Sequence, residues 1–174
     1  MTFVEELAAA EIGATFNFYR EGERAGLLRR RLAAYLAAGE QAPLLLVGEA
    51  AGYRGARISG LPFTSERQLK GAGPGEATAT VVRRVLAELG LDEQTLCWNL
   101  VPTHPGTESS NRRPTRAEVE AARPFLARLA RGRFVLAVGR LAAAATGAPY
   151  IRHPSHGGAR AFREGLLRFA PGGR

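Results

Sequence analysis

The chain has 174 residues, which is enough for one domain with a substantial hydrophobic core, and its apolar runs are too short to cross a bilayer. An acidic N-terminus and a single cysteine, Cys97, argue against a secretory signal, an internal disulfide and a cysteine-held metal cluster, so we expect a cytoplasmic protein. The formal charge of +8 favours a polyanionic partner such as nucleic acid, although a bias toward arginine and alanine would raise the charge in the same way.

In the first half of the chain, the spacing of apolar residues predicts an amphipathic helix over about residues 20–38, with Gly39 as its C-cap. We interpret the arginines of this helix as a solvated face. An uninterrupted apolar run at Leu44–Val47 predicts a strand that is buried on both faces. Residues 50–75 are rich in glycine, proline, serine and threonine and predict a long loop, which in a compact domain is usually functional or disordered.

In the second half, predicted helices and strands alternate. We predict helices over about residues 76–89, 116–131, 140–146 and 158–169, strands over 95–101, 134–138 and 150–152, and an irregular stretch over 105–114. Thr115 and Glu118 form a capping-box pattern at the start of the second of these helices. The alternation predicts a three-layer α/β/α fold with a central, mainly parallel four-stranded sheet, in a single domain over residues 1–174.

Glu49 directly follows the first predicted strand. In open α/β sheets, ligands bind at the carboxyl ends of the strands, so this carboxylate is a candidate to orient a water or to stabilise a developing cation. Gly48 and Gly52 predict a tight turn with a close approach of the backbone to a ligand. The alternative for Glu49 is an exposed loop acid, or an acid near a helix N-terminus.

Phe63 and Asn99 are candidates for binding a flat ligand. Phe63 lies in the long predicted loop, where it could stack on a nucleobase or simply pin the loop to the core. Asn99 lies inside an otherwise apolar strand, where its amide needs a partner. That amide offers a donor and an acceptor that match the O4 and N3–H edge of uracil, and the alternative is a structural cap on a loop.

His153 follows the last predicted strand and could donate a hydrogen bond to an oxygen that gains negative charge. The hydroxyl of Ser155 and the amides of Gly157 and Gly158 could bind a phosphate at the start of the final helix. The alternative for Ser155 is an ordinary N-cap.

The remaining signals are weak. The sequence has no Walker motif and no G-x-G-x-x-G motif, and no strand precedes the glycine-rich residues 71–75, which we interpret as a flexible loop. His104 and His156 are weaker candidates, and for both the alternative is simple exposure.

Together these residues resemble the uracil-DNA glycosylase superfamily, because short motifs occur in the family's order over about residues 44–166. All but the last are similar to motifs of the family 4 enzymes, and the last is similar to the second active-site motif of the superfamily. They are Gly48–Gly52 (Gly-Glu-x-Pro-Gly in the family), Gly60–Phe63 (Gly-x-Pro-Phe), Asn99–Val101 with Pro105 (Asn-x-Val, then Pro), Asn111–Pro114 (Asn-Arg-x-Pro) and His153–Ser155.

The sequence departs from the family 4 pattern at several positions. Family 4 enzymes hold a four-iron cluster with four cysteines, whereas this chain has only Cys97 and carries Thr103 where a cluster cysteine would stand. Ala51 replaces the usual proline, and residues 156–158 differ from those expected to enter the DNA stack. The resemblance is therefore to the superfamily, with family 4-like motifs and no cluster.

The resemblance implies a monofunctional DNA glycosylase of base excision repair that hydrolyses the N-glycosidic bond of uracil, or of a related deaminated base, after flipping it out of DNA. Phe63 would stack on the base and Asn99 would read its edge. His153 would donate to O2 of the departing uracil anion, while Glu49 would offset the sugar cation and position the attacking water. Flanking phosphates would be held by Ser155, Gly157, Gly158, Arg152 and Arg160.

The implied partner is DNA in the nucleoid, with no metal or organic cofactor, no membrane and no obligate protein partner. Two alternatives stay open at this stage. One is a DNA-binding relative with weak or no catalysis. The other is a small-molecule enzyme that acts on a nucleoside or nucleotide, which the absence of a phosphate-loop motif makes less favourable. The sequence leaves open whether uracil, hypoxanthine or xanthine is preferred.

Overall fold

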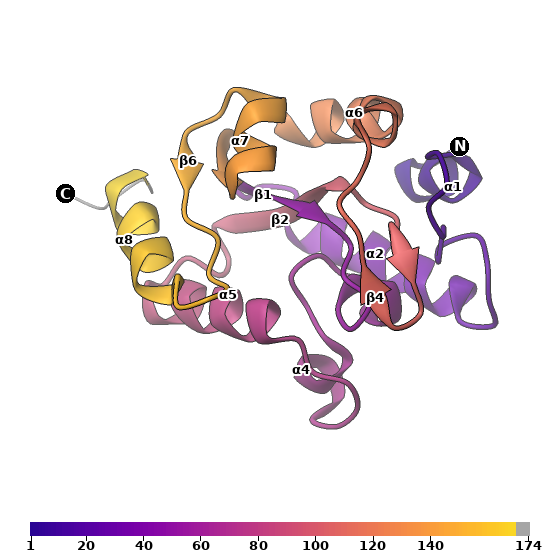
Figure 1. The fold of residues 1–174 in the computed structure, drawn as a ribbon, viewed down its shortest axis with the longest axis horizontal. Coiled ribbons are helices and arrows are strands. Elements are labelled where there is room, and N and C mark those ends of the chain that lie inside the picture. Colours follow the sequence, from indigo (N-terminus) through magenta and orange to yellow (C-terminus); the bar gives the residue numbers. More distant parts are fainter. Residues whose placement is uncertain (170–174) are drawn as a thin grey trace.

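The computed structural model describes residues 1–169 and is built around a four-stranded sheet in the order β2-β1-β5-β6, with every pair of neighbours parallel (Figure 1). The strands are β1 (Leu44–Ala50), β2 (Thr95–Val101), β5 (Phe134–Val138) and β6 (Tyr150–Ile151). The predicted parallel four-stranded sheet is therefore confirmed. Its central strand β1 is apolar from Leu44 to Val47 because it is covered on both faces.

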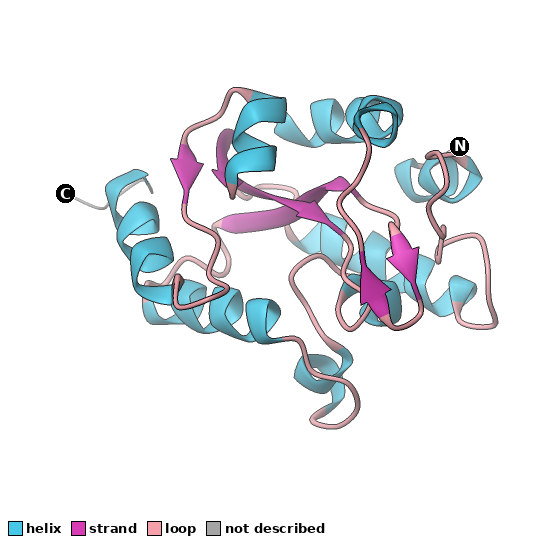
Figure 2. Ribbon diagram, viewed as in Figure 1, coloured by secondary structure: helices cyan, strands magenta, loops and turns pink. Residues whose placement is uncertain are grey.

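Helices cover both faces of the sheet, which completes the predicted three layers (Figure 2). Leu45 and Val47 belong to one buried cluster with residues of four helices of seven or more residues, and Leu44 and Leu46 belong to a second cluster with residues of two helices. The first set is α1 (Phe3–Ala9), α2 (Ala25–Ala38), α6 (Arg116–Ala130) and α7 (Arg140–Thr146), and the second is α5 (Ala77–Glu88) and α8 (Ala159–Phe169). None of the helices within residues 1–169 has the length and apolar character needed to span a membrane.

The structure differs from the sequence-based expectation mainly in short elements. The helix expected from residue 20 begins at Ala25, and α1 was not predicted, although Thr2 and Glu5 form a capping box at its start. The expected loop at 50–75 contains two short helices, α3 (Ala56–Ser59) and α4 (Glu66–Lys70). The expected irregular stretch at 105–114 contains a two-stranded hairpin, β3 (Gly106–Thr107) and β4 (Ser110–Asn111).

Parallel pairing brings the carboxyl ends of the strands to one edge of the sheet. In the register of β1 and β2, Gly48 lies opposite Asn99. β6 ends at Ile151, so His153 follows at the same edge. Segments that are distant in sequence therefore meet where an open α/β sheet binds its ligands.

Candidate active site

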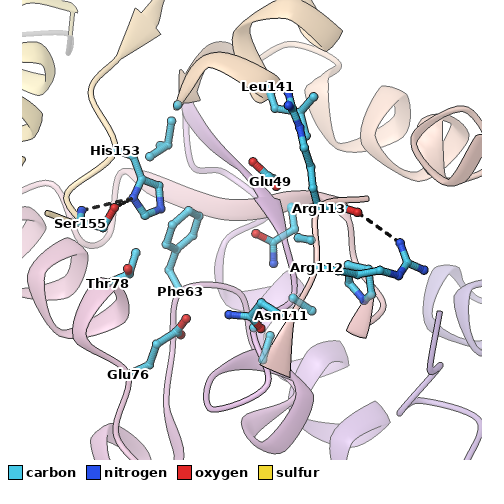
Figure 3. Close-up of a pocket in the computed structure, with 18 of the residues that line it drawn as sticks. Glu49, Phe63, Glu76, Thr78, Asn111, Arg112, Arg113, Leu141, His153 and Ser155 are labelled. Atoms are coloured by element: carbon cyan, nitrogen blue, oxygen red, sulfur yellow. Dashed lines mark hydrogen bonds between the residues drawn. The ribbon is translucent and has the colours of Figure 1, made fainter. Parts of the chain in front are cut away.

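A pocket of about 540 Å³ lies at this edge of the sheet. Glu49, Phe63, Asn99 and His153, which the sequence predicted to act together, all line it. Figure 3 shows Glu49, Phe63 and His153 around the same space, with Glu76 and Asn111 on its other sides. The carboxylate and the imidazole thus face one cavity, as the sequence-based hypothesis requires.

The side chains of Phe63 and Asn99 both lie close to the backbone of Gly48. A Cβ at position 48 would overlap Phe63 Cζ and would lie 2.9 Å from Asn99 Oδ1. Phe63 is buried and adopts a φ of 47°, in the left-handed region that a bulky residue rarely occupies. Such strained positions concentrate at functional sites. The close approach expected at Gly48 is therefore made by neighbouring side chains.

The side chain of Asn99 is buried, with 5% exposure, yet it makes no hydrogen bond to any residue of the described chain. The described residues whose side-chain polar atoms are fully buried without a partner are Thr95 and Trp98, whereas the amide of Asn99 borders the pocket. Its donor and acceptor are consequently available to a ligand. The structure thus favours the binding interpretation of Asn99 over that of a structural cap.

Glu49 lies within β1, one residue before its end, and not after the strand as expected. It is half-buried in the pocket wall. Burial raises the pKa of its carboxyl group, and the positive charge of Arg113 partly opposes this effect. The carboxylate has no ion pair within residues 1–169, so it can act on a bound ligand or water.

His153 is held by the turn that follows β6. The backbone N–H of Ser155 donates to His153 Nδ1 at 3.2 Å, and the Ser155 hydroxyl oxygen lies 2.7 Å from the same atom. Burial, followed by the charges of His156 and Arg152, lowers the pKa of His153, which favours the neutral ring. Because Nδ1 accepts the Ser155 N–H, the neutral ring carries its proton on Nε2. His153 can therefore donate a hydrogen bond without being charged.

Ser155, Gly157 and Gly158, which were expected to bind a phosphate, lie in this turn. They differ in whether their polar groups are already hydrogen-bonded. Ser155 lines the pocket, but its hydroxyl is engaged with His153 and with His156 Nδ1 at 3.1 Å. The amide of Gly158 donates to the Ser155 carbonyl at 3.0 Å, so it is not free for a phosphate. Gly157 is exposed and has a φ of 75°.

The two arginines that sequence reasoning placed on DNA lie outside the residues that line the pocket. Arg152 is exposed between β6 and the turn, where its charge contributes to the lowered pKa of His153. Arg160 lies in α8, with a side chain 91% exposed, and its Nε pairs with Glu164 at 2.8 Å. A solvated ion pair of this kind contributes little to stability.

Sequence reasoning missed a second carboxylate in the pocket. Glu76 precedes α5, and its side chain fits against two glycines: a Cβ on Gly52 would lie 2.6 Å from Glu76 Oε1, and one on Gly55 would overlap Oε2. Burial raises the pKa of Glu76. Gly52 thus leaves room for a carboxylate as well as for a ligand. The absence of a Cβ at two nearby positions was the only signal in the sequence.

Three arginines also line the pocket and were not predicted there: Arg112, Arg113 and Arg140. Arg112 uses both terminal nitrogens on the buried Glu118, at 2.6 and 2.8 Å, and Glu118 in turn completes the predicted capping box with Thr115. Arg113 and Arg140 are exposed at the rim. They add positive charge beside the two carboxylates.

His104, a weak candidate whose alternative was simple exposure, is fully buried, so that alternative is wrong. Its Nδ1 lies 2.7 Å from the carbonyl oxygen of Ala51, just after β1, and its Nε2 lies 2.8 Å from that of Thr107 in β3. The imidazole therefore ties the β3–β4 hairpin to the end of the central strand. The hairpin is stabilised by this distant contact, which no local pattern in residues 105–114 reveals.

The residues present do not fit the iron–sulfur cluster of the family 4 enzymes. Cys97 is buried in β2, and it is the only cysteine of the chain. Thr103, at the position of a cluster ligand, is buried with its hydroxyl 2.6 Å from that of Thr15. Within residues 1–169, no group of three or more His, Cys, Asp or Glu side chains is arranged to hold a metal ion.

Comparisons with known proteins bear on the family and the fold of the chain. The family model described as the Uracil DNA glycosylase superfamily matches residues 36–167. The fold is similar to that of a solved structure, wild-type SMUG2 of Pedobacter heparinus, with a TM-score of 0.61 and 15% identity over 94% of each chain. No protein with a curated description matched the sequence. The family match covers most of the chain and contains all four of the side chains first predicted to form the site, and the chain therefore belongs to the uracil-DNA glycosylase superfamily.

Proposed function

We propose that this protein is a monofunctional DNA glycosylase that excises uracil, or a related deaminated base, by hydrolysis of the N-glycosidic bond. The observation that carries the proposal is the buried amide of Asn99, which has no partner within the described chain and borders the pocket shared by Glu49, Phe63 and His153. A base stacked in duplex DNA cannot reach such a pocket, so the nucleotide is flipped out before reaction.

Recognition would use the two side chains that pack around Gly48. The ring of Phe63 provides a face on which the flipped base stacks, an interaction worth about 1–3 kcal/mol per base. The amide of Asn99 pairs with the O4 and N3–H edge of uracil. Cytosine presents an amino group and an unprotonated ring nitrogen at that edge, so it would leave the buried amide mismatched, and such mismatches discriminate strongly.

The chemistry would use the two titratable groups. As the bond between C1′ and N1 breaks, its electron pair goes to the base, which leaves as an anion, and the sugar becomes an oxocarbenium-like cation. The Nε2–H of His153 donates to O2 of the anion, and one such donor is worth about 10²–10³ in rate. The Glu49 carboxylate stabilises the cation and accepts a proton from the water whose oxygen bonds to C1′.

The DNA backbone would lie across the basic rim. The net charge of +8 and the exposed Arg113 and Arg140 beside the pocket support this placement. Arg152, Arg160 and the turn at Gly157 would contact phosphates farther from the flipped nucleotide. Most of this contact is independent of sequence and weakens with salt through counterion release. Such a substrate would place the protein in the nucleoid of the cytoplasm.

The test is release of free base from oligonucleotides that contain uracil, hypoxanthine or xanthine, opposite a pairing partner and in single strands. We expect abasic product from at least one of them, and a loss of about 10²–10³ in single-turnover rate for Glu49→Gln and His153→Ala. Glu120→Gln is a matched control, because Glu120 is exposed on α6, away from the residues that line the pocket, and pairs with Arg123. Salt-dependent DNA binding with no abasic product would show a non-catalytic relative instead.

A further inference from the structure

The position of the Phe63 ring depends on a backbone turn whose conformation is unfavourable for a phenylalanine. Phe63 has a φ of 47°, and Gly60 in the same turn has a φ of 79°. Short hydrogen bonds close the turn internally: the Ser59 hydroxyl donates to the Thr64 carbonyl at 2.6 Å, and the Thr64 hydroxyl donates to the Pro62 carbonyl at 3.0 Å. A left-handed phenylalanine persists only when surrounding contacts over-determine it.

Arg83 supplies such contacts from outside the turn. From α5, its Nε donates to the Phe63 carbonyl at 3.2 Å, and one Nη donates to the Pro62 carbonyl at 3.1 Å and to the Thr64 hydroxyl at 2.8 Å. The guanidinium therefore contacts three consecutive residues centred on Phe63. Its planar fork can do so in one geometry, which a lysine ammonium cannot reproduce.

The surroundings of Arg83 show that these bonds are its main polar contacts. The side chain is partly buried, and within residues 1–169 it forms no ion pair with a carboxylate. Its guanidinium carbon lies 5.8 Å from the centroid of the Tyr35 ring. The guanidinium is thus held by two backbone carbonyls and the Thr64 hydroxyl, with the Tyr35 hydroxyl and the charge of Asp92 nearby. Buried charges are more often paired directly with an opposite charge.

We propose that Arg83 is a positioning residue that holds Phe63 in its left-handed conformation and thereby sets the plane on which the flipped base stacks. This inference rests on the proposed glycosylase function. Arg83 does not line the pocket itself, so it acts on the base only through the 62–64 backbone. Its contribution to catalysis should therefore vanish when the Phe63 ring is absent.

The experiment is a double-mutant cycle in single-turnover uracil excision, with Arg83→Gln and Arg83→Lys made in the parent and in Phe63→Ala. We expect either Arg83 substitution to lower the rate by at least about tenfold in the parent and by less than about twofold in Phe63→Ala. Equal losses in both backgrounds would overturn the proposal and leave a general structural role. Arg84→Gln is the matched control, because Arg84 neighbours Arg83 on α5 and its 60% exposed side chain lies 3.6 Å from Glu88.

A second measurement does not depend on excision. Hydrogen exchange of the amides in residues 61–65, measured relative to those of α6, should be faster in Arg83→Gln and unchanged in Arg84→Gln. Exchange that stays at the parental rate would overturn the proposal. If the parent protein releases no base from any substrate, the proposed function fails, and the exchange result still decides whether Arg83 holds the turn.

Discussion

The ring of Phe63 occupies the space that a side chain on Gly48 would need. A Cβ at position 48 would overlap Phe63 Cζ, and the same atom would lie 2.9 Å from Asn99 Oδ1. One missing side chain in β1 thus lets an aromatic ring from a loop and an amide from β2 meet at the pocket. The proposed base-binding surface would therefore depend on Gly48 as much as on the groups that would touch the base.

Gly48→Ala should therefore lower uracil excision while the protein stays folded. The added methyl group would displace Phe63 or Asn99, and we expect kcat/KM to fall by at least about tenfold, since small misplacements cost large factors in rate. Gly26→Ala is the matched control, because Gly26 lies inside α2 and a Cβ there would meet nothing closer than 3.6 Å. It should leave activity unchanged and raise stability by about 0.5–1 kcal/mol. Parental activity in Gly48→Ala would contradict the proposed packing.

The pH dependence of excision should follow the titration of Glu49 and His153, whose pKa values are both shifted by burial. Burial raises the pKa of Glu49 above 4.5, and burial with nearby cations lowers that of His153 below 6.5. The active form would hold Glu49 ionised and His153 neutral, so kcat/KM should fall on the acid side and stay level from about pH 7 to 8. A Glu49→Gln variant should lose the part of the acid limb that belongs to Glu49. Activity that rises steadily above pH 7 would contradict a neutral His153 donor.

Stability should fall in acid because of Glu66. This buried carboxylate pairs with Arg31, Arg24 and Lys70, and hydrogen bonds from Arg31 above all lower its pKa from 4.5 to about 2. The pairing therefore stabilises the fold fully above pH 4.5 and is lost as the pH falls toward 2. We expect Glu66→Gln to reduce the free energy of unfolding in urea by roughly 1–2 kcal/mol at pH 7. The difference between parent and variant should shrink at pH 3, and a constant difference would exclude this linkage.

DNA affinity should depend on the arginines of the pocket rim. Arg140→Gln removes one exposed positive charge at the pocket, so it should weaken binding equally for different sequences and reduce the slope of log affinity against log salt by about 1. The measurement is fluorescence anisotropy with labelled duplexes over a range of salt concentrations. Arg123→Gln is the control, because Arg123 pairs with Glu120 on α6. If both variants changed the slope equally, the rim would have no special part in DNA binding.

Much of the fold was predictable because strong local signals mark its long elements. The apolar run of β1 and the capping box at Thr115 each identify an element without reference to the rest of the chain. The four side chains that meet in the pocket were predictable because Glu49, Asn99 and His153 lie near strand ends and Phe63 lies in a family motif. Parallel pairing then brings strand ends together.

The parts that escaped prediction depend on contacts between distant segments. Glu76 has the local pattern of an ordinary residue before a helix, and only the fold shows that Gly52 and Gly55 make room for its carboxylate. The β3–β4 hairpin has strands of two residues each, and His104 links its Thr107 to Ala51, which lies 53 residues before His104 in the sequence. Burial of such groups is a property of the tertiary structure, which periodicity and composition do not encode.

The anchoring of the hairpin has a consequence for how a nucleotide would enter. His104 links Ala51 to Thr107, Asn111 accepts the amide of Tyr53 at 2.9 Å, and this side of the cavity is thereby fastened to the sheet by bonds from within. These hydrogen bonds should hold the hairpin side of the pocket in place before a ligand binds. Under the proposed function, the rotation that brings a damaged nucleotide into the pocket would therefore be made by the DNA strand.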